Sequence, residues 1–200
     1  MENFSIIAAC CLFILCPLSK AVASSTGTND LDLNKLNLIA LRVYAANPFP
    51  CDKHNKIDYR AARCYRLIKI SHAVSGIARS TPNTILINGN WLAKLNDDQI
   101  AFIIAHELAH HINDQSPGLS SKMSSRESEL RADLFAGFIL KRASYDARQI
   151  TNFLKNIEYR RILSFPLGTS RYPSYRSRRA VIEKSQNIEY FELIGRIHKR

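Results

Sequence analysis

The most regular pattern of apolar positions in the chain lies in the stretch DQIAFIIAHELAHHINDQ, from Asp98 to Gln115. Its apolar residues recur every three or four positions, which is the spacing of one face of an α-helix. Just before it, Asn96-Asp97-Asp98 offers side chains that can cap the first turn of a helix. We therefore expect a helix here, with a buried face made of Ile100, Ile103, Ile104, Leu108 and Ile112.

Similar patterns predict further helices. Asn29 to Ala46 carries an apolar stripe and is followed by Pro48 and Pro50, which end a helix. The other predicted helices are Trp91 to Leu95, Ser125 to Arg142 and Asp146 to Ile157, followed by a basic C-terminal region with Pro166 and Pro173. The Ser-rich segment between Asp114 and Ser125 is expected to be a loop, and Ser116 to Ser125 is a candidate lid.

β-branched residues replace the helical pattern after Arg66. We expect one extended segment that includes Ile68, Ile70, Val74 and Ile77, and a second one from Thr84 to Ile87 after a turn at Thr81-Pro82-Asn83. Together with the helices, this predicts an α+β fold that is mainly helical and has a small antiparallel sheet.

The N-terminus resembles an export signal. Ile6 to Leu18 is an apolar run shorter than the roughly 20 residues of a membrane span, and Ala21-Val22-Ala23 after it has the small-x-small pattern of a cleavage site. We expect residues 1–23 to be removed near Ala23, which leaves one domain, residues 24–200, in the periplasm or outside the cell. An uncleaved membrane anchor is an open alternative because the N-terminus carries Glu2 and no cation before the run, and lipidation at Cys10 is a minor one.

Cleavage would leave two cysteines, Cys51 and Cys64. In an exported chain they most simply form a disulfide, typically worth about 2–4 kcal/mol; two buried thiols are the alternative. The net charge is +11, and residues 141–200 hold 14 Lys and Arg against 5 Asp and Glu. Such a surface attracts anionic lipid, lipopolysaccharide or wall polymers, although a solvated basic face is an equally good interpretation. We find no nucleic-acid-binding motif.

The long helix carries the candidate chemistry. His106 and His110 are four residues apart, so both imidazoles can reach one point, and this arrangement suits Zn²⁺. Glu107 lies where its carboxylate can reach a metal-bound water without binding the metal, as a general base must. The pattern is the His-Glu-x-x-His signature of zincins, and an otherwise apolar helix gives these polar groups little reason to be buried without a metal. His54, His72, His111 and His198 lack this spacing, and we expect them to be solvated or packed.

A catalytic zinc needs a third protein ligand and an open position for water. The predicted helix SRESELRADLFAGFIL offers Glu129 as that ligand and Asp133, four residues on, as an acceptor that orients a ligand imidazole. Glu127, on roughly the opposite side of the helix, is the alternative ligand. Ala132, Ala136 and Gly137 in the same helix are small enough to let another helix approach closely.

The two motifs together resemble the zinc metallopeptidases that include the CAAX prenyl protease and the bacterial heat-shock protease HtpX. The similarity covers about residues 70–140, from the strand NTILING through His106-Glu107-Leu108-Ala109-His110 to Glu129-Leu130-Arg131-Ala132-Asp133. It implies a zincin-like metalloprotease domain with one Zn²⁺ on His106, His110 and Glu129, Glu107 as general base, and a sheet edge near Ser75 to Ala78 that receives the substrate.

Two departures from the family pattern matter. The prenyl protease and HtpX are embedded in membranes, whereas this chain has no spanning run after its signal, and so looks more like the soluble periplasmic BepA-like and LoiP-like members. The family often carries a His-Pro and an Arg after the metal helices, where this chain has Tyr172-Pro173 and Arg178. These are candidate cleft residues, and Tyr172 either donates a hydrogen bond to the oxyanion or packs.

The resemblance implies an endopeptidase that acts on unfolded or misassembled cell-envelope proteins, with a protein or peptide as substrate. Two other functions are open: a noncatalytic zinc-containing chaperone or adaptor, and a hydrolase of cell-wall peptides. The intact Glu107 argues against the first, because a structural metal site needs no base, and the basic C-terminal region suits the second.

Overall fold

The computed structural model describes residues 29–48, 67–81, 84–114, 124–164, 172–189 and 192–193. The predicted signal peptide, Cys51 and Cys64, His54, His198 and most of the candidate lid lie outside these residues. The described helices are α1 (Asn29–Ala46), α2 (Gly89–Leu92), α3 (Asp97–Asp114), α4 (Ser125–Arg142), α5 (Ala147–Ser164) and α6 (Tyr175–Ser185). None of them combines the length and the hydrophobicity needed to cross a membrane.

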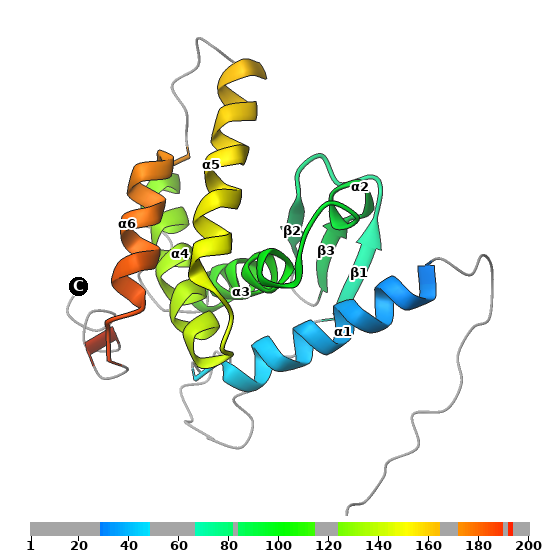
Figure 1. The fold of residues 1–200 in the computed structure, drawn as a ribbon, viewed down its shortest axis with the longest axis horizontal. Helices are drawn as coiled ribbons and strands as arrows, with labels where there is room; N and C mark the ends of the chain where they lie inside the picture. The colour runs from blue at the N-terminus through cyan, green and yellow to red at the C-terminus, as the bar shows by residue number, and fades with distance from the viewer. Residues whose placement is uncertain are drawn as a thin grey trace, which may run out of the picture.

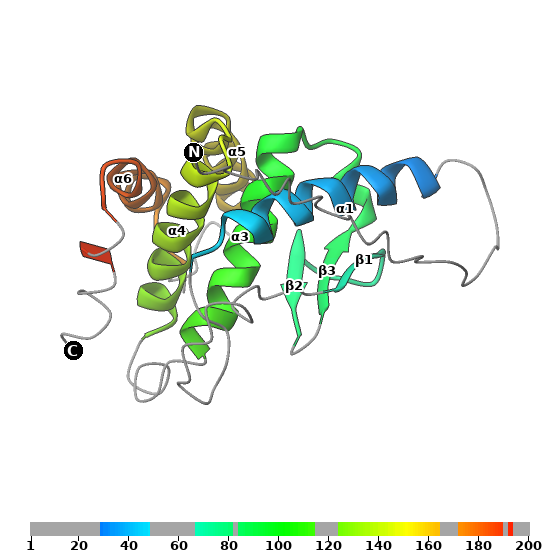
Figure 2. The same cartoon turned by 90° about the horizontal axis from the view of Figure 1, so that it is seen from below.

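Helix α3 lies at the centre of the fold. In Figure 1 the sheet and α2 lie on one side of it and α4, α5 and α6 on the other, while α1 runs beneath. The face of α3 predicted from its apolar spacing is buried, and Asn96 caps its start by accepting a hydrogen bond from the Gln99 N–H at 3.0 Å. The view from below shows α1 passing across both α3 and the sheet (Figure 2). Helix α1 therefore packs against both the helical part of the fold and the sheet.

The α+β prediction is confirmed, but the antiparallel sheet is wrong. The sheet is mixed, with strand order β1-β3-β2: β1 (Leu67–Ser71) runs parallel to β3 (Thr84–Asn88), and β2 (Ala78–Ser80) runs antiparallel to it. The single extended segment predicted before the turn is two strands, because the chain turns at residues 72–77. The Asn88 side chain stabilises this connection by donating to the carbonyls of Val74 and Gly76 at 2.8 and 3.0 Å.

Two of the predicted helices have the observed bounds, two others differ in their bounds, and one observed helix was not predicted. α1 and α4 have the predicted bounds. α2 occupies Gly89–Leu92 instead of Trp91 to Leu95, because Asn88 caps it by accepting from the Asn90 N–H. α5 continues past Ile157 to Ser164, since no Gly or Pro interrupts the chain before Pro166. α6 was not predicted; it is mostly polar, and it is capped at its N-terminus by Ser174, whose side chain accepts from the Ser177 N–H.

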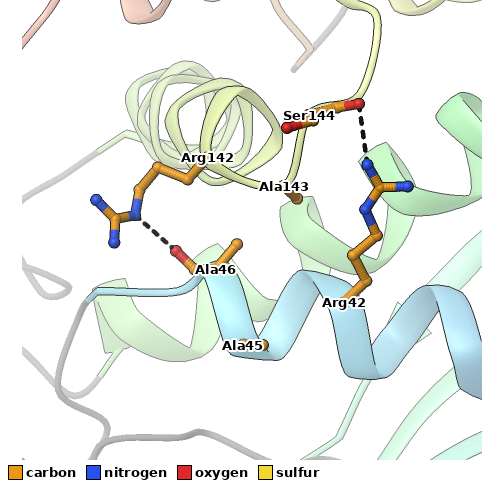
Figure 3. A pocket seen from close by; sticks show the side chains of 6 residues that line it. All are labelled: Arg42, Ala45, Ala46, Arg142, Ala143 and Ser144. Carbon is orange, nitrogen blue, oxygen red and sulfur yellow. Dashed lines mark hydrogen bonds between the residues drawn. The ribbon is translucent and has the colours of Figure 1, made fainter.

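Two arginines link the ends of α1 and α4. Arg42 donates to the carbonyl of Ser144 just after α4, and Arg142 Nε donates to the carbonyl of Ala46 at the end of α1, at 3.2 and 3.0 Å. Figure 3 shows the two guanidinium groups on opposite sides of a shallow pocket floored by Ala45, Ala46 and Ala143, pointing away from each other. Each arginine therefore satisfies a terminal carbonyl of the other helix, and this fixes α1 against α4.

Gly137 permits the close approach of α4 and α6. A Cβ atom built at this position would collide with the side chain of Ser185, which is fully buried and donates to the Ile182 carbonyl. We predict that Gly137→Ala lowers the free energy of unfolding by about 1–3 kcal/mol, the usual cost of overpacking, as measured by urea denaturation. Gly137→Ala combined with Ser185→Gly should recover part of this loss; equal stability of Gly137→Ala and the unmodified protein would contradict the packing described.

Candidate metal centre

Three side chains from two helices converge on one point. His106 and His110 lie one turn apart on α3, and Glu129 faces them from α4. The Nε2 atoms of the two histidines are 3.1 Å apart, and the Glu129 carboxylate oxygens lie 3.3 Å from His106 Nε2 and 3.5 Å from His110 Nε2. The imidazole rings are nearly perpendicular, at 87°, so their lone pairs aim inward from different directions.

This triad could hold a metal ion. A tetrahedral ion with bonds of about 2.0–2.1 Å keeps neighbouring ligand atoms about 3.3 Å apart, close to the three distances in this cluster. Two nitrogens and one carboxylate oxygen would leave one position of a four-coordinate ion for a further ligand.

Glu127, the alternative ligand, does not reach the cluster. It lies in the first turn of α4, where its carboxylate accepts from the backbone N–H of Ser124 at 2.9 Å while Ser124 Oγ accepts from the Glu127 N–H. These reciprocal bonds form a capping box. The same cap fixes the start of α4 and thus the turn on which Glu129 lies.

Asp133 supports the cluster from behind. Its carboxylate is fully buried and lies 3.0 Å from His106 Nδ1. With a proton on Nδ1 donated to Asp133, His106 Nε2 keeps its lone pair for a metal. Asp133 thus lies next to the candidate ligand His106 and outside the cluster of His106, His110 and Glu129, as predicted for an acceptor that orients a ligand imidazole.

Arg178 balances the buried charge of Asp133. Its Nε and Nη2 atoms both donate to the Asp133 carboxylate at 2.7 Å, and its side chain is 15% exposed. The residue lines the cleft, as expected for a candidate cleft residue, but its hydrogen bonds are to Asp133. This pairing was not predicted. The sequence signal that points to it is a carboxylate in an apolar part of α4, since a buried charge needs a partner of opposite charge.

The pKa values follow from these contacts. Burial lowers the pKa of His106, but hydrogen bonds to Asp133 and Glu129 outweigh burial and raise it to about 9. Burial raises the pKa of Glu129, but the hydrogen bonds of His106 and His110 bring it well below its usual range. Burial also raises the pKa of Asp133, and Arg178 and His106 together more than reverse this. Without a metal, the cluster therefore holds a proton on His106 at neutral pH.

The cluster opens into a cleft of about 530 Å³. Helix α3 forms the floor with Phe102, Ile103, His106, Glu107 and His110; Gly76 to Ser80, including the edge strand β2, forms one wall, and α5 forms the other. Glu107 faces this cleft beside the two histidines, and Tyr172, 55% exposed, lies at its rim.

A contact that the sequence did not reveal links β2 to α3. His111 is buried, and its Nε2 lies 2.5 Å from Ser80 Oγ, which also donates to the backbone carbonyl of Glu107 at 3.5 Å. Ser80 and His111 thus hold the edge strand beside the turn that carries Glu107. His72, by contrast, is exposed and contacts Asn90. The predictions for both histidines, packed or solvated, are in accord with these positions.

We predict that metal affinity depends on pH through His106. Because its pKa in the metal-free protein is about 9, a metal ion must displace a proton at lower pH. The apparent affinity for Zn²⁺ should rise about tenfold per pH unit between pH 7 and 8.5, as measured by calorimetric titration with proton release. In the metal-free protein, the stability contributed by the His106 proton is fully present below pH 6.5 and is lost as pH rises through about 9. An affinity for Zn²⁺ that does not change with pH would contradict the predicted role of the His106 proton in metal binding.

We further predict that Arg178→Met destabilises the protein by about 3–5 kcal/mol, because it removes the guanidinium that pairs with the buried charge of Asp133. The double variant Asp133→Asn, Arg178→Met should be more stable than Arg178→Met alone, since it removes the orphaned charge. Urea denaturation of both variants measures the difference. Equal losses in the two variants would show that the ion pair does not carry the effect.

The comparisons with known proteins add nothing to this geometry. No protein-family model, no curated protein and no solved structure matches the chain.

Proposed function

We propose that the chain is a zinc-dependent endopeptidase with a zincin-like metal site. The observation that carries the proposal is the position of Glu107: it adjoins the His106, His110 and Glu129 donor set and faces the same cleft. A binding protein with a structural metal has no use for an ionisable carboxylate beside an open ligand position. A hydrolase needs one as general base.

The donor set favours Zn²⁺ over Mg²⁺ or Ca²⁺, because two imidazoles and one carboxylate suit zinc and the others prefer oxygen ligands. A zinc ion on His106, His110 and Glu129 would supply Lewis acidity toward a peptide carbonyl and an attacking water. Glu107 would accept a proton from the attacking water and pass it to the leaving amine. Asp133 keeps His106 in the tautomer that binds metal, and Arg178 holds Asp133 ionised.

The cleft provides a place for the peptide. β2 is the edge of the sheet, and residues Gly76 to Ser80 line the cleft beside the metal-binding residues. An extended substrate can pair with this edge as an added strand, which brings one of its carbonyls over the cluster. Tyr172, exposed at the rim of the cleft, would then either donate a hydrogen bond to the oxyanion that forms on the carbonyl or pack against the substrate.

The proposed site of action rests on the sequence alone. A cleaved signal near Ala23 would place the enzyme in the periplasm or outside the cell, where unfolded or misassembled envelope proteins are the available substrates. The 14 Lys and Arg of residues 141–200 would favour attachment to anionic lipid, lipopolysaccharide or cell-wall polymers.

The direct test compares Glu107→Gln with the unmodified protein for zinc content and for cleavage of unfolded casein. Both should bind about one zinc per chain, and the substitution should slow cleavage by about a hundredfold or more, because it removes the general base. Glu189→Gln, which neutralises an exposed carboxylate elsewhere, should change neither quantity.

The other outcomes point to other functions. Zinc binding with no cleavage of casein or of muropeptides by the unmodified protein would favour a noncatalytic chaperone or adaptor. Cleavage of muropeptides but not of casein would identify a cell-wall peptide hydrolase. A protein that binds no zinc would refute the assignment of the metal site.

A further inference from the structure

The two walls of the cleft differ in chemistry. β2 presents a strand edge, whereas the cleft residues contributed by α5 are all hydrocarbon: Phe153, Leu154 and Ile157. Figure 1 shows β2 and α5 on opposite sides of α3. A peptide bound along the edge of β2 therefore has α5 facing its other side.

The hydrocarbon surface begins next to the candidate metal ligands. Phe102 lies one turn before His106 on α3, and the two ring centroids are 5.7 Å apart. Phe102, Phe153 and Leu154 are almost fully buried, so they form the floor of a hollow instead of projecting into it. Ile157 is partly exposed and forms its lip. These four residues, with Ile103, are called the apolar hollow below.

A second, smaller hollow lies next to the first. Its volume is about 110 Å³, it shares Phe153 and Ile157 with the cleft, and it also touches Trp91, Lys94 and Gln99. Gln99 precedes His106 by seven residues of α3, which is a rise of about 10 Å. An extended peptide covers that distance in about three residues. The second hollow thus lies toward the N-terminal end of α3 from the candidate metal cluster.

We propose that the apolar hollow selects the substrate. It takes a large apolar side chain on the residue next to the scissile bond, on the side that runs toward the N-terminal end of α3, and the peptide continues for about three residues into the second hollow. Phe153 and Ile157 are the specificity-determining residues, because they line both hollows. This inference rests on the proposed peptidase function and defines its substrate class: unfolded segments with an exposed Leu, Ile, Met or Phe.

The transfer of an apolar side chain from water into a hydrocarbon-lined hollow is favourable, and the free energy gained increases with the apolar area that is buried. Segments that carry large apolar side chains are buried in folded proteins and exposed in unfolded ones. A cleft built in this way therefore distinguishes misassembled proteins from native ones without reading a specific sequence.

The test is a cleavage assay on the zinc-loaded protein with a mixture of unstructured peptides, in which mass spectrometry identifies the cut bonds. We expect Leu or Phe to be favoured over Ala by at least about tenfold at one position flanking the cut. Ile157→Lys, which places an ammonium group at the lip, should reduce that preference at least about tenfold. Asn152→Lys adds the same charge on the same helix at an exposed position outside the cleft, and it should keep the preference.

Ile157→Ala provides a second variant that adds no charge. It should widen the lip and shift the preference toward larger side chains such as Phe and Trp. If the unmodified protein cuts peptides with no apolar preference beside the cut, or if both Ile157 variants keep it unchanged, the inference is overturned while the peptidase function stands. If the unmodified protein cuts none of the peptides and no casein, the proposed function fails first, and the inference fails with it.

Discussion

Asp133 carries a negative charge at the meeting point of three helices, with its side chain removed from water. Such a charge is unfavourable unless opposite charge and hydrogen bonds surround it. Here Arg178 of α6 supplies two hydrogen bonds and His106 of α3 a third contact. The position of α6, the tautomer of His106 and the charge state of the cluster all depend on this one carboxylate, which links the packing of the fold to the chemistry of its site.

The candidate metal ligands on α3 and α4 are polar groups that lie close together next to a hydrocarbon core. Ala109 on α3 and Ala132 and Ala136 on α4 are fully buried, and their small side chains allow the two helices to approach closely. Close packing places Glu129 within reach of both histidines. The Glu129 carboxylate lies 3.3 Å from His106 Nε2, so it can pair with a protonated His106.

Much of this could be predicted from the sequence, because the strongest signals were local. The spacing of His106 and His110 places both imidazoles on one face, and the four-residue step from Glu129 to Asp133 does the same on α4. The sheet order and α6 could not be predicted in this way. A strand as short as β2 has no periodicity to read. α6 is mostly polar, and the contacts that hold it are tertiary: Arg178 pairs with Asp133, and Ile182 and Ser185 are fully buried. The contact between Ser80 and His111 is likewise a tertiary contact with no sequence pattern.

The central claim is that two imidazoles and one carboxylate hold a single catalytic zinc ion. X-ray absorption at the zinc edge of the purified protein tests it most directly, because the spectrum reports the type and number of ligand atoms. The account predicts about one zinc per chain, with only nitrogen and oxygen neighbours at about 2.0–2.1 Å and an imidazole contribution that falls when His110 is replaced by Ala. Sulfur ligands, or a spectrum unchanged by His110→Ala, would contradict it.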